Sequence, residues 1–214
     1  MSQRSEPDPH PASAPRTVPL VLPDLRLELI TDRGVFSHHG VDAGTRFLLD
    51  RSPPPPAEGD LLDLGCGYGP IALAVARRAP SATVWSVDVD RRARALTAAN
   101  AERAGLANVR VVSPDQVPPE VRFAALWSNP PIHIGKVPLR HLLVRWLTRL
   151  SADGWAVLVV HKYLGADTLA KWLAAEGFPT ERLRSRRGYR LLQVGAPGPE
   201  WYGRGGATSP AADR

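Results

Sequence analysis

Three glycines at alternating positions form the first group of residues whose types and spacing suggest chemistry. The largely apolar run 61–64 reads as a strand, and Gly65, Gly67 and Gly69 follow it directly before Pro70. Glycine lets the main chain turn sharply and approach a ligand closely, and a helix that begins at Pro70 offers unpaired N–H groups to an anion. The spacing differs from the Gly-x-Gly-x-x-Gly pattern of dinucleotide sites. The loop therefore predicts a ligand whose anionic part is held by main-chain atoms.

The second group is the run Asn129-Pro130-Pro131-Ile132, which follows another predicted strand. Methylation of an exocyclic aromatic amine needs two hydrogen-bond acceptors that hold the nitrogen while it becomes tetrahedral. The side-chain oxygen of Asn129 and the main-chain carbonyl of Pro130 can supply them, because the prolines fix φ. Asn-Pro is also a common way to start a turn. Its position directly after a strand, downstream of the glycine loop, favours the chemical reading.

Both groups need a parallel sheet to place them at one edge. Apolar runs rich in β-branched residues alternate with Ala/Leu/Arg-rich segments of helical spacing, which predicts βαβ units. The expected strands are Asp60–Leu64, Thr83–Val87, Val109–Val112, Ala124–Trp127, Trp155–His161, Arg182–Arg184 and Tyr189–Val194. The expected helices are Pro70–Arg78, Arg91–Ala104, Leu139–Leu150 and Ala166–Ala175.

Length and composition indicate one cytoplasmic domain. The 214 residues are 43% hydrophobic, no apolar run is long enough to span a bilayer, and Cys66 is the only cysteine, which excludes a disulfide framework and a multi-thiolate metal site. We expect disordered tails at residues 1–17 and 196–214 around a domain of residues 18–195. The net charge is +6 and rests almost wholly on arginine, which suits phosphate but also fits a general preference for arginine over lysine.

The tight glycine spacing resembles the first motif of class I methyltransferases, which implies S-adenosylmethionine as the cofactor. In that family the loop holds the methionine part of the cofactor. The resemblance implies that Asp63 faces the cofactor's ammonium group and that Asp88, beside Val89, accepts hydrogen bonds from the ribose hydroxyls. An acid near the adenine amino group is expected at Asp115, which also suits a plain turn. Cys66, within the loop, is either a cofactor contact or a small packing residue.

Longer stretches of the chain resemble the methyltransferase small domain family. The matching segments include Gly34-Val35-Phe36-Ser37, Asp42-Ala43-Gly44-Thr45, Val159-Val160-His161-Lys162 and Gly188-Tyr189-Arg190-Leu191-Leu192, within Leu25 to Val194. The resemblance implies a Rossmann-like class I methyltransferase fold of the α/β class, with a seven-stranded, mainly parallel sheet flanked by helices. It also implies methylation of an exocyclic base amine, with guanine N2 in ribosomal RNA as the leading expectation.

The chain departs from the family at the substrate. The fourth motif position, which is often aromatic so that a base can stack on it, is Ile132. Two-domain relatives carry an extra N-terminal half for which this chain has no room. Substrate contacts are therefore sought elsewhere, at Phe36, at His133 and Lys136 after the motif, and at Arg187 and Arg190 in an arginine-rich segment, each of which is also consistent with a solvated surface residue.

The sequence thus predicts an S-adenosylmethionine-dependent N-methyltransferase with RNA as its partner and with no metal or membrane. Methylation of a protein glutamine or a small-molecule amine remains the first alternative, because the same motif serves it. A noncatalytic RNA-binding module with this fold is the second. The noncatalytic alternative is opposed by a set of residues that a protein without catalysis would have no physical need to keep together: Gly65, Gly67, Gly69, Asp88 and Asn129.

Overall fold

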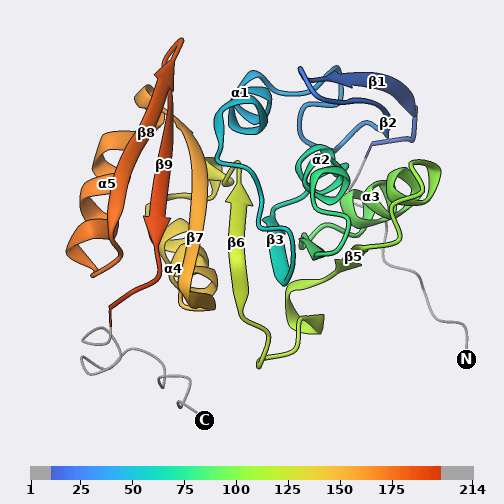
Figure 1. The fold of residues 1–214 in the computed structure, drawn as a ribbon. Coiled ribbons are helices and arrows are strands. Elements are labelled where there is room, and N and C mark those ends of the chain that lie inside the picture. Colours follow the sequence, from blue (N-terminus) through green and yellow to red (C-terminus); the bar gives the residue numbers. More distant parts are fainter. Residues whose placement is uncertain (1–10, 199–214) are drawn as a thin grey trace, which may run out of the picture.

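The computed structural model describes residues 11–198, in which strands and helices alternate along the chain (Figure 1). The strands are β1 (Arg16–Val21), β2 (Arg26–Thr31), β3 (Asp60–Leu64), β4 (Thr83–Val87), β5 (Val109–Val112), β6 (Phe123–Ser128), β7 (Leu150–His161), β8 (Thr180–Arg186) and β9 (Tyr189–Gly195). The helices are α1 (Ala43–Arg51), α2 (Pro70–Arg78), α3 (Arg91–Arg103), α4 (Lys136–Leu147) and α5 (Ala166–Ala175), and short 3-10 turns cover Pro114–Gln116, Ile132–Ile134 and Lys162–Leu164.

Seven strands form one sheet in the order β5-β4-β3-β6-β7-β9-β8. The neighbours from β5 to β7 are parallel, and β9 is antiparallel to both β7 and β8. This confirms the predicted seven-stranded, mainly parallel sheet. The chain leaves β3 toward β4 on one side and returns to β6 on the other, so the strand order reverses between β3 and β6. In open α/β sheets, ligands bind at the carboxyl ends of the strands at such a reversal.

Helices cover both faces of the sheet and create two buried layers. Alternate residues of a strand point to opposite faces, so Leu61 joins the cluster under α1, α2 and α3 while Leu62 joins the cluster under α4 and α5. Leu126 and Trp127 of β6 divide in the same way. The central strands are thus apolar on both sides, as strands of a covered parallel sheet must be.

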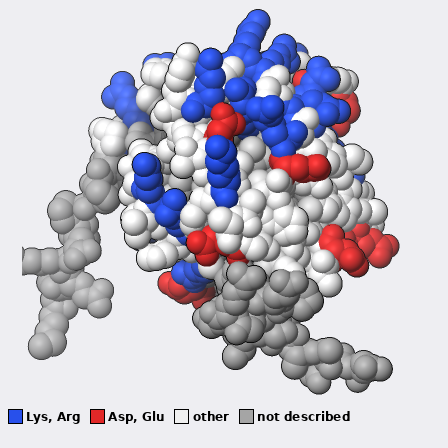
Figure 2. Space-filling view, turned by 90° about the vertical axis from the view of Figure 1, so that its left-hand side faces the viewer, with Lys and Arg blue, Asp and Glu red and all other residues white. Residues whose placement is uncertain are grey.

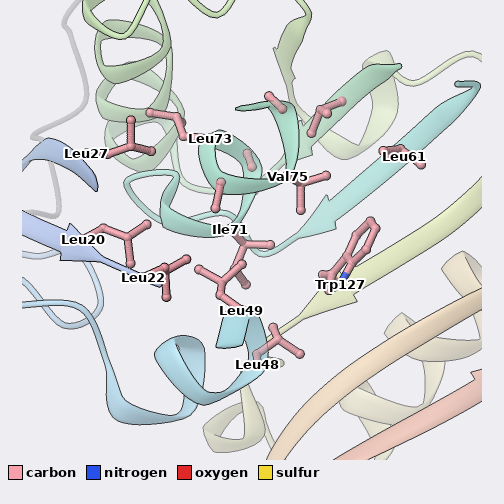
Figure 3. Close-up of a cluster of buried hydrophobic side chains, with 14 of the residues drawn as sticks. Leu20, Leu22, Leu27, Leu48, Leu49, Leu61, Ile71, Leu73, Val75 and Trp127 are labelled. Atoms are coloured by element: carbon pink, nitrogen blue, oxygen red, sulfur yellow. The ribbon is translucent and has the colours of Figure 1, made fainter. Parts of the chain in front are cut away.

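A separate antiparallel hairpin, β1–β2, was not among the predicted elements. Its inward residues alternate, with Leu20 and Leu27 buried toward Leu73 of α2 (Figure 3). The buried side chain of Asn100 fastens it to the core: Nδ2 donates to the Ile30 and Tyr68 carbonyls, and Oδ1 accepts from the Ile30 N–H. The hairpin therefore belongs to the same core as α2 and α3.

The predicted domain boundaries need one correction. Residues 16 and 17 were assigned to a disordered tail, whereas β1 begins at Arg16 and pairs with β2. Ahead of it, Ser13 Oγ and the Ala14 N–H donate to the Asp32 carboxylate, both at 2.6 Å. The outer parts of the expected tails, residues 1–10 and 199–214, lie outside the described residues.

Helix α4 begins and ends three residues before the predicted range Leu139–Leu150. Pro138 suggests a boundary in the sequence, but it sits in the first turn, where a missing N–H costs nothing. At the other end Leu150 is the first residue of β7 and pairs with Phe123. Leu150 is buried, as the apolar stripe requires, but as part of a strand.

Candidate active site

The glycine loop joins β3 to α2 at the point where the strand order reverses. Gly65, Gly67 and Gly69 have φ angles of 78°, 57° and 92°, so all three occupy the left-handed region that side chains rarely adopt. The Gly65 N–H donates to the Val87 carbonyl at 2.8 Å, which ties the start of the loop to the end of β4. The loop shape is therefore fixed by glycine and by main-chain contacts.

The three glycines face different surroundings. A Cβ atom built on Gly65 would meet nothing within 4 Å, and one on Gly67 would lie 3.9 Å from Val35. A Cβ on Gly69 would lie 2.7 Å from Leu73, within the protein. Gly65 and Gly67 thus border open space beside the segment that contains Val35 and Phe36, whereas Gly69 allows α2 to pack closely against α3.

Asp88 follows β4 and holds the middle of the loop. Its Oδ2 accepts from the Gly67 N–H and its Oδ1 from the Asp90 N–H, both at 2.9 Å. Burial raises the pKa of this carboxyl, against the effect of these hydrogen bonds. Each oxygen keeps a further lone pair, and the neighbouring Val89 is 81% exposed. A carboxylate beside an exposed apolar side chain suits a ribose joined to a flat base.

Asp63 is the most unusual titratable group in the site. Its side chain is 1% exposed; Oδ2 accepts from the Ala72 N–H at 2.9 Å, and Oδ1 has no hydrogen-bond partner among residues 11–198. Burial, with a smaller contribution from Asp88, raises its pKa to about 8. A buried carboxylate oxygen without a donor is a fitting partner for an ammonium group, so the residues present fit the zwitterionic cofactor that the glycine motif implies.

The two remaining residues of the predicted cofactor set, Cys66 and Asp115, make other contacts in the structure. Cys66 is buried and accepts a hydrogen bond from Thr97 Oγ1 at 3.5 Å, and burial raises the pKa of its thiol. Its side chain fills space between the loop and α3. The Asp115 side chain is 88% exposed and forms an ion pair with Arg145 of α4 at 3.1 Å. No contact links Asp115 to the glycine loop within the described part of the chain.

Asn129 stands directly after β6 and is held by two residues from the start of α1. Its Nδ2 donates to Asp42 Oδ2 at 3.0 Å and to Thr45 Oγ1 at 3.1 Å. Both N–H bonds of the amide are thus used, and no described residue donates to its Oδ1. The neighbouring Ser128 donates through Oγ to the Leu64 carbonyl at 2.7 Å, which ties the end of β6 to the end of β3. The free acceptor of Asn129 therefore lies at the same sheet edge as the glycine loop.

The two prolines shape the turn after Asn129. Pro131 has φ −74° and ψ 75°, and the Ile132 N–H donates to the Pro130 carbonyl at 2.8 Å, which makes an inverse γ-turn. A carbonyl oxygen has two lone pairs, so Pro130 can accept one more hydrogen bond. Ile132 is half-buried and packs against the cluster under α4 and α5.

The residues predicted to contact substrate are spread around this edge. Phe36 is 65% exposed next to Val35, His133 is exposed between β6 and α4, and Lys136 is exposed as the first residue of α4. Arg187 is exposed at the turn between β8 and β9. Arg190 instead lies half-buried, with Nε 3.8 Å from Asp167. The structure brings Phe36 close to the loop, while Arg190 has a partner within the fold.

Asp42 and Thr45 are functional candidates that the sequence did not single out. The Asp42 carboxylate also accepts from the Thr45 N–H at 3.0 Å, as an ordinary helix N-cap does. Aspartate is a favoured N-cap residue, which is the local signal for that cap. Their contact with Asn129 spans 84 to 87 residues of sequence, and no local pattern points to it.

Neither a cluster of metal-ligating side chains nor a membrane-spanning helix is found within residues 11–198. No three His, Cys, Asp or Glu side chains there are grouped in a way that would hold a metal ion. No helix in that range is long and apolar enough to cross a membrane.

Comparison with known proteins matches residues 26–193 to the family model of the methyltransferase small domain. The chain is 34% identical over 167 residues to an uncharacterized protein of Bacillus subtilis, YbxB, covering 77% of this chain and 83% of that protein. It is 38% identical over 179 residues to ribosomal RNA small subunit methyltransferase C of Ectopseudomonas mendocina, covering 82% of this chain and 53% of that enzyme. The chain thus spans about half the length of this curated methyltransferase.

Solved structures agree with the family match. A 16S rRNA N2 methyltransferase of T. thermophilus in complex with AdoMet and guanosine superposes with a TM-score of 0.71 at 25% identity, over 90% of this chain and 53% of that one. A methyltransferase from Pyrococcus furiosus shares the fold at 19% identity, with a TM-score of 0.60 over 72% of this chain and 82% of that one. The chain therefore belongs to the methyltransferase small domain family, a family of S-adenosylmethionine-dependent methyltransferases.

Proposed function

We propose that this protein transfers a methyl group from S-adenosylmethionine to the exocyclic amine of a base in ribosomal RNA, with guanine N2 as the target. The observation that carries the proposal is the orientation of Asn129. Because Asp42 and Thr45 occupy both N–H groups of its amide, the acceptor oxygen is left for a substrate that brings its own N–H. An aromatic amine has two such hydrogens.

Asn129 and Pro130 prepare the amine for attack. The Asn129 Oδ1 accepts one N–H and the remaining lone pair of the Pro130 carbonyl accepts the other, so the nitrogen is held while its own lone pair leaves conjugation with the ring. Positive charge develops on that nitrogen, and two fixed acceptor dipoles stabilise it. Pre-set acceptors need no reorganisation during the step, which is where such dipoles contribute most.

The other half of the edge holds the cofactor. Asp63 would hold its ammonium group, Gly65 and Gly67 would leave room for its methionine part, and Asp88 and Val89 would hold the ribose and adenine. When bound, the cofactor supplies an electrophilic methyl group on a positively charged sulfur. The Ser128 hydroxyl donates to the Leu64 carbonyl and so joins the acceptor half to the strand that leads into the glycine loop, which fixes the distance between the two halves.

The choice of ribosomal RNA rests on the relatives. The proteins named ribosomal RNA small subunit methyltransferase C, and the solved T. thermophilus enzyme with guanosine bound, share the fold and the matched region. The net charge of +6 favours a polyanionic substrate. Ile132 favours a second candidate, a glutamine or small-molecule amine, because it gives no ring on which a base can stack.

Transfer of labelled methyl groups tests the proposal. Radiolabelled S-adenosylmethionine is incubated with the protein and with total RNA, ribosomal subunits or protein extract from cells that lack it. We expect label in RNA, in digested nucleosides as N2-methylguanosine. Asn129→Ala should lower the rate about 10²- to 10³-fold, as loss of a preorganised polar group does, and leave cofactor affinity unchanged. Label in protein or small molecules would establish the second candidate, and equal turnover by Asn129→Ala would remove Asn129 from the mechanism.

A further inference from the structure

A cavity of about 500 Å³ opens beside the acceptor site and has no role in the mechanism above. Three elements line it: the turn of the β1–β2 hairpin, helix α1 with the residues just before it, and the turn between β8 and β9. The lining residues used below are Val21, Ala43, Arg46, Phe47, Arg187 and Tyr189. Its volume lies within the usual range of small-ligand sites, about 300 to 1,000 Å³.

The rim of the cavity is basic. Arg46 and Arg187 are both exposed, and neither guanidinium makes an ion pair with any described residue. Asp50 and Arg186, which also line the cavity, offset each other at 3.8 Å. Figure 2, which views the molecule from the left-hand side of Figure 1, shows Lys and Arg side chains gathered at the top, the end at which the β8–β9 turn lies in Figure 1. The remaining charge is that of the two unpaired arginines, which suits a phosphate.

The walls of the cavity offer flat and apolar surface. Tyr189 is half-buried and packs edge-on against His161, with ring centroids 4.9 Å apart, so its ring is held in one orientation. Phe47 is buried at the base, and Val21 is an exposed apolar residue on the opposite wall. An aromatic ring and aliphatic side chains near a cationic rim match the two parts of a nucleotide, the base and the phosphate.

The cavity lies next to the residues that hold Asn129. Ala43 on its wall directly follows Asp42, the residue that holds Asn129. A Cβ atom on Gly44 would lie 2.7 Å from Tyr189 Cε1, so the tyrosine ring rests against the same turn of α1. A polymer with its target base at Asn129 can therefore place a neighbouring nucleotide at the cavity.

Arg187 has a left-handed main-chain conformation that other residue types adopt more readily. Its φ of 48° and the φ of 89° at Gly188 make a two-residue turn with both positions left-handed, between the paired residues Arg186 and Tyr189. Asn-Gly is the favoured pair for such a turn, and arginine is an uncommon choice. Uncommon backbone conformations of this kind cluster at functional sites, which favours a use for the Arg187 guanidinium.

We propose that this cavity binds a nucleotide of the RNA substrate that neighbours the methylated one. Arg46 and Arg187 hold its phosphate, and its base or ribose lies against Tyr189 and Val21. The proposal rests on the proposed function and names a second contact between this protein and the RNA.

The test compares Arg46→Ala and Arg187→Asn with Arg184→Ala in the full chain. Arg184→Ala removes the same charge from the same hairpin at an exposed position outside the cavity, and Arg187→Asn gives the turn its favoured sequence. Binding of a fluorescein-labelled, single-stranded 12-nucleotide RNA of mixed sequence is followed by anisotropy over a salt series. Each cavity variant should weaken binding at least fivefold more than Arg184→Ala and lower the slope of log Kd against log salt by about 0.7.

Methyl transfer to total RNA separates this proposal from the proposed function. If the cavity binds a neighbouring nucleotide, both cavity variants should raise the KM for RNA about five- to tenfold with kcat and cofactor affinity unchanged, a loss typical of one ionic hydrogen bond. RNA affinity and KM equal to those of Arg184→Ala overturn the cavity proposal while the methyl transfer stands. Absence of transfer to RNA by the unmodified protein overturns the proposed function, and the anisotropy series still reports on the cavity.

Discussion

The two halves of the site are fixed by different kinds of contact. In the cofactor half, main-chain atoms do most of the positioning: the Gly65 N–H binds the Val87 carbonyl, and the Gly67 N–H binds Asp88, 21 residues away. In the acceptor half, side chains hold side chains, and the Asn129 amide is anchored by Asp42 and Thr45 from 87 and 84 residues earlier. One half depends on the path of the backbone, and the other depends on a few specific polar groups.

This difference predicts opposite sensitivities. The cofactor half should tolerate changes of side chains that do not alter the loop path, but it should fail when a Cβ atom enters the space beside Gly67. The acceptor half should tolerate small changes in side-chain shape, but kcat should fall when one hydrogen-bond partner of Asn129 is removed. Substitutions in each half, measured for cofactor affinity and for kcat separately, test this contrast.

The largest effect is expected from Gly67→Val. The substituted side chain would occupy the open space that borders the loop and would be strained at a φ of 57°. Cofactor affinity by calorimetry should fall about 100-fold or more, equivalent to about 2.7 kcal/mol. Gly105→Val is the matched control, because Gly105 has a φ of 65° and open surroundings at the end of α3. Wild-type affinity for Gly67→Val would show that the cofactor does not lie beside Gly67, and an equal loss with Gly105→Val would show that backbone strain, and not occupied space, limits binding.

A smaller effect is expected from Thr45→Val, which removes one of the two acceptors of the Asn129 amide. The loss of one hydrogen bond is worth about 1 kcal/mol, so kcat should fall about five- to tenfold while cofactor affinity stays constant. Thr31→Val is the matched control, because the Thr31 hydroxyl is buried without a hydrogen-bond partner within residues 11–198. A fall in cofactor affinity with Thr45→Val would mean that the two halves are not independent.

The contrast also explains which parts of the fold could be predicted. β3, β4, β5, α2 and α5 coincide with their predicted ranges, because each is a short apolar or periodic run bounded by glycine, proline or a capping acid. The β1–β2 hairpin was missed although Val18, Leu20, Leu27 and Leu29 alternate with exposed residues. It forms a two-stranded sheet that needs α2, α3 and Asn100 to be stable, and those contacts are distant in sequence.

The same limit applies to the site. The glycine loop and the Asn-Pro-Pro run are local patterns, so their positions at one sheet edge followed from the strand order. The contact of Asn129 with Asp42 is not local, because it depends on how α1 folds back over the sheet. For Asp115, which follows the expected strand, the local pattern does not show that its side chain pairs with Arg145 of α4, 30 residues later.

A pH-dependent effect is expected from Asp63→Asn in the protein without cofactor. Burial raises the pKa of Asp63 to about 8, above its ordinary value of 3.8. The folded state thus binds a proton that the unfolded state releases, and wild-type stability is lost as pH rises from about 4 to about 8. Asparagine has no charge to bury, so the melting temperature of Asp63→Asn should rise relative to that of the wild type as pH increases through this range. The difference should reach at least about 4 °C at pH 8 and stay constant at higher pH. A difference that does not change with pH would show that Asp63 is ionised in the folded protein.

The smallest effect is expected from Asp115→Ala, which tests whether the cofactor half extends as far as Asp115. Its carboxylate is mostly exposed, and a surface ion pair such as that with Arg145 contributes about 0 to 1 kcal/mol. Calorimetry should therefore show cofactor affinity within about twofold of the wild type, and Arg145→Ala should behave alike. A tenfold loss with Asp115→Ala but not with Arg145→Ala would place the adenine amino group at this carboxylate. The cofactor half would then depend on a side chain at its outer end, and the contrast with the acceptor half would hold for the loop alone.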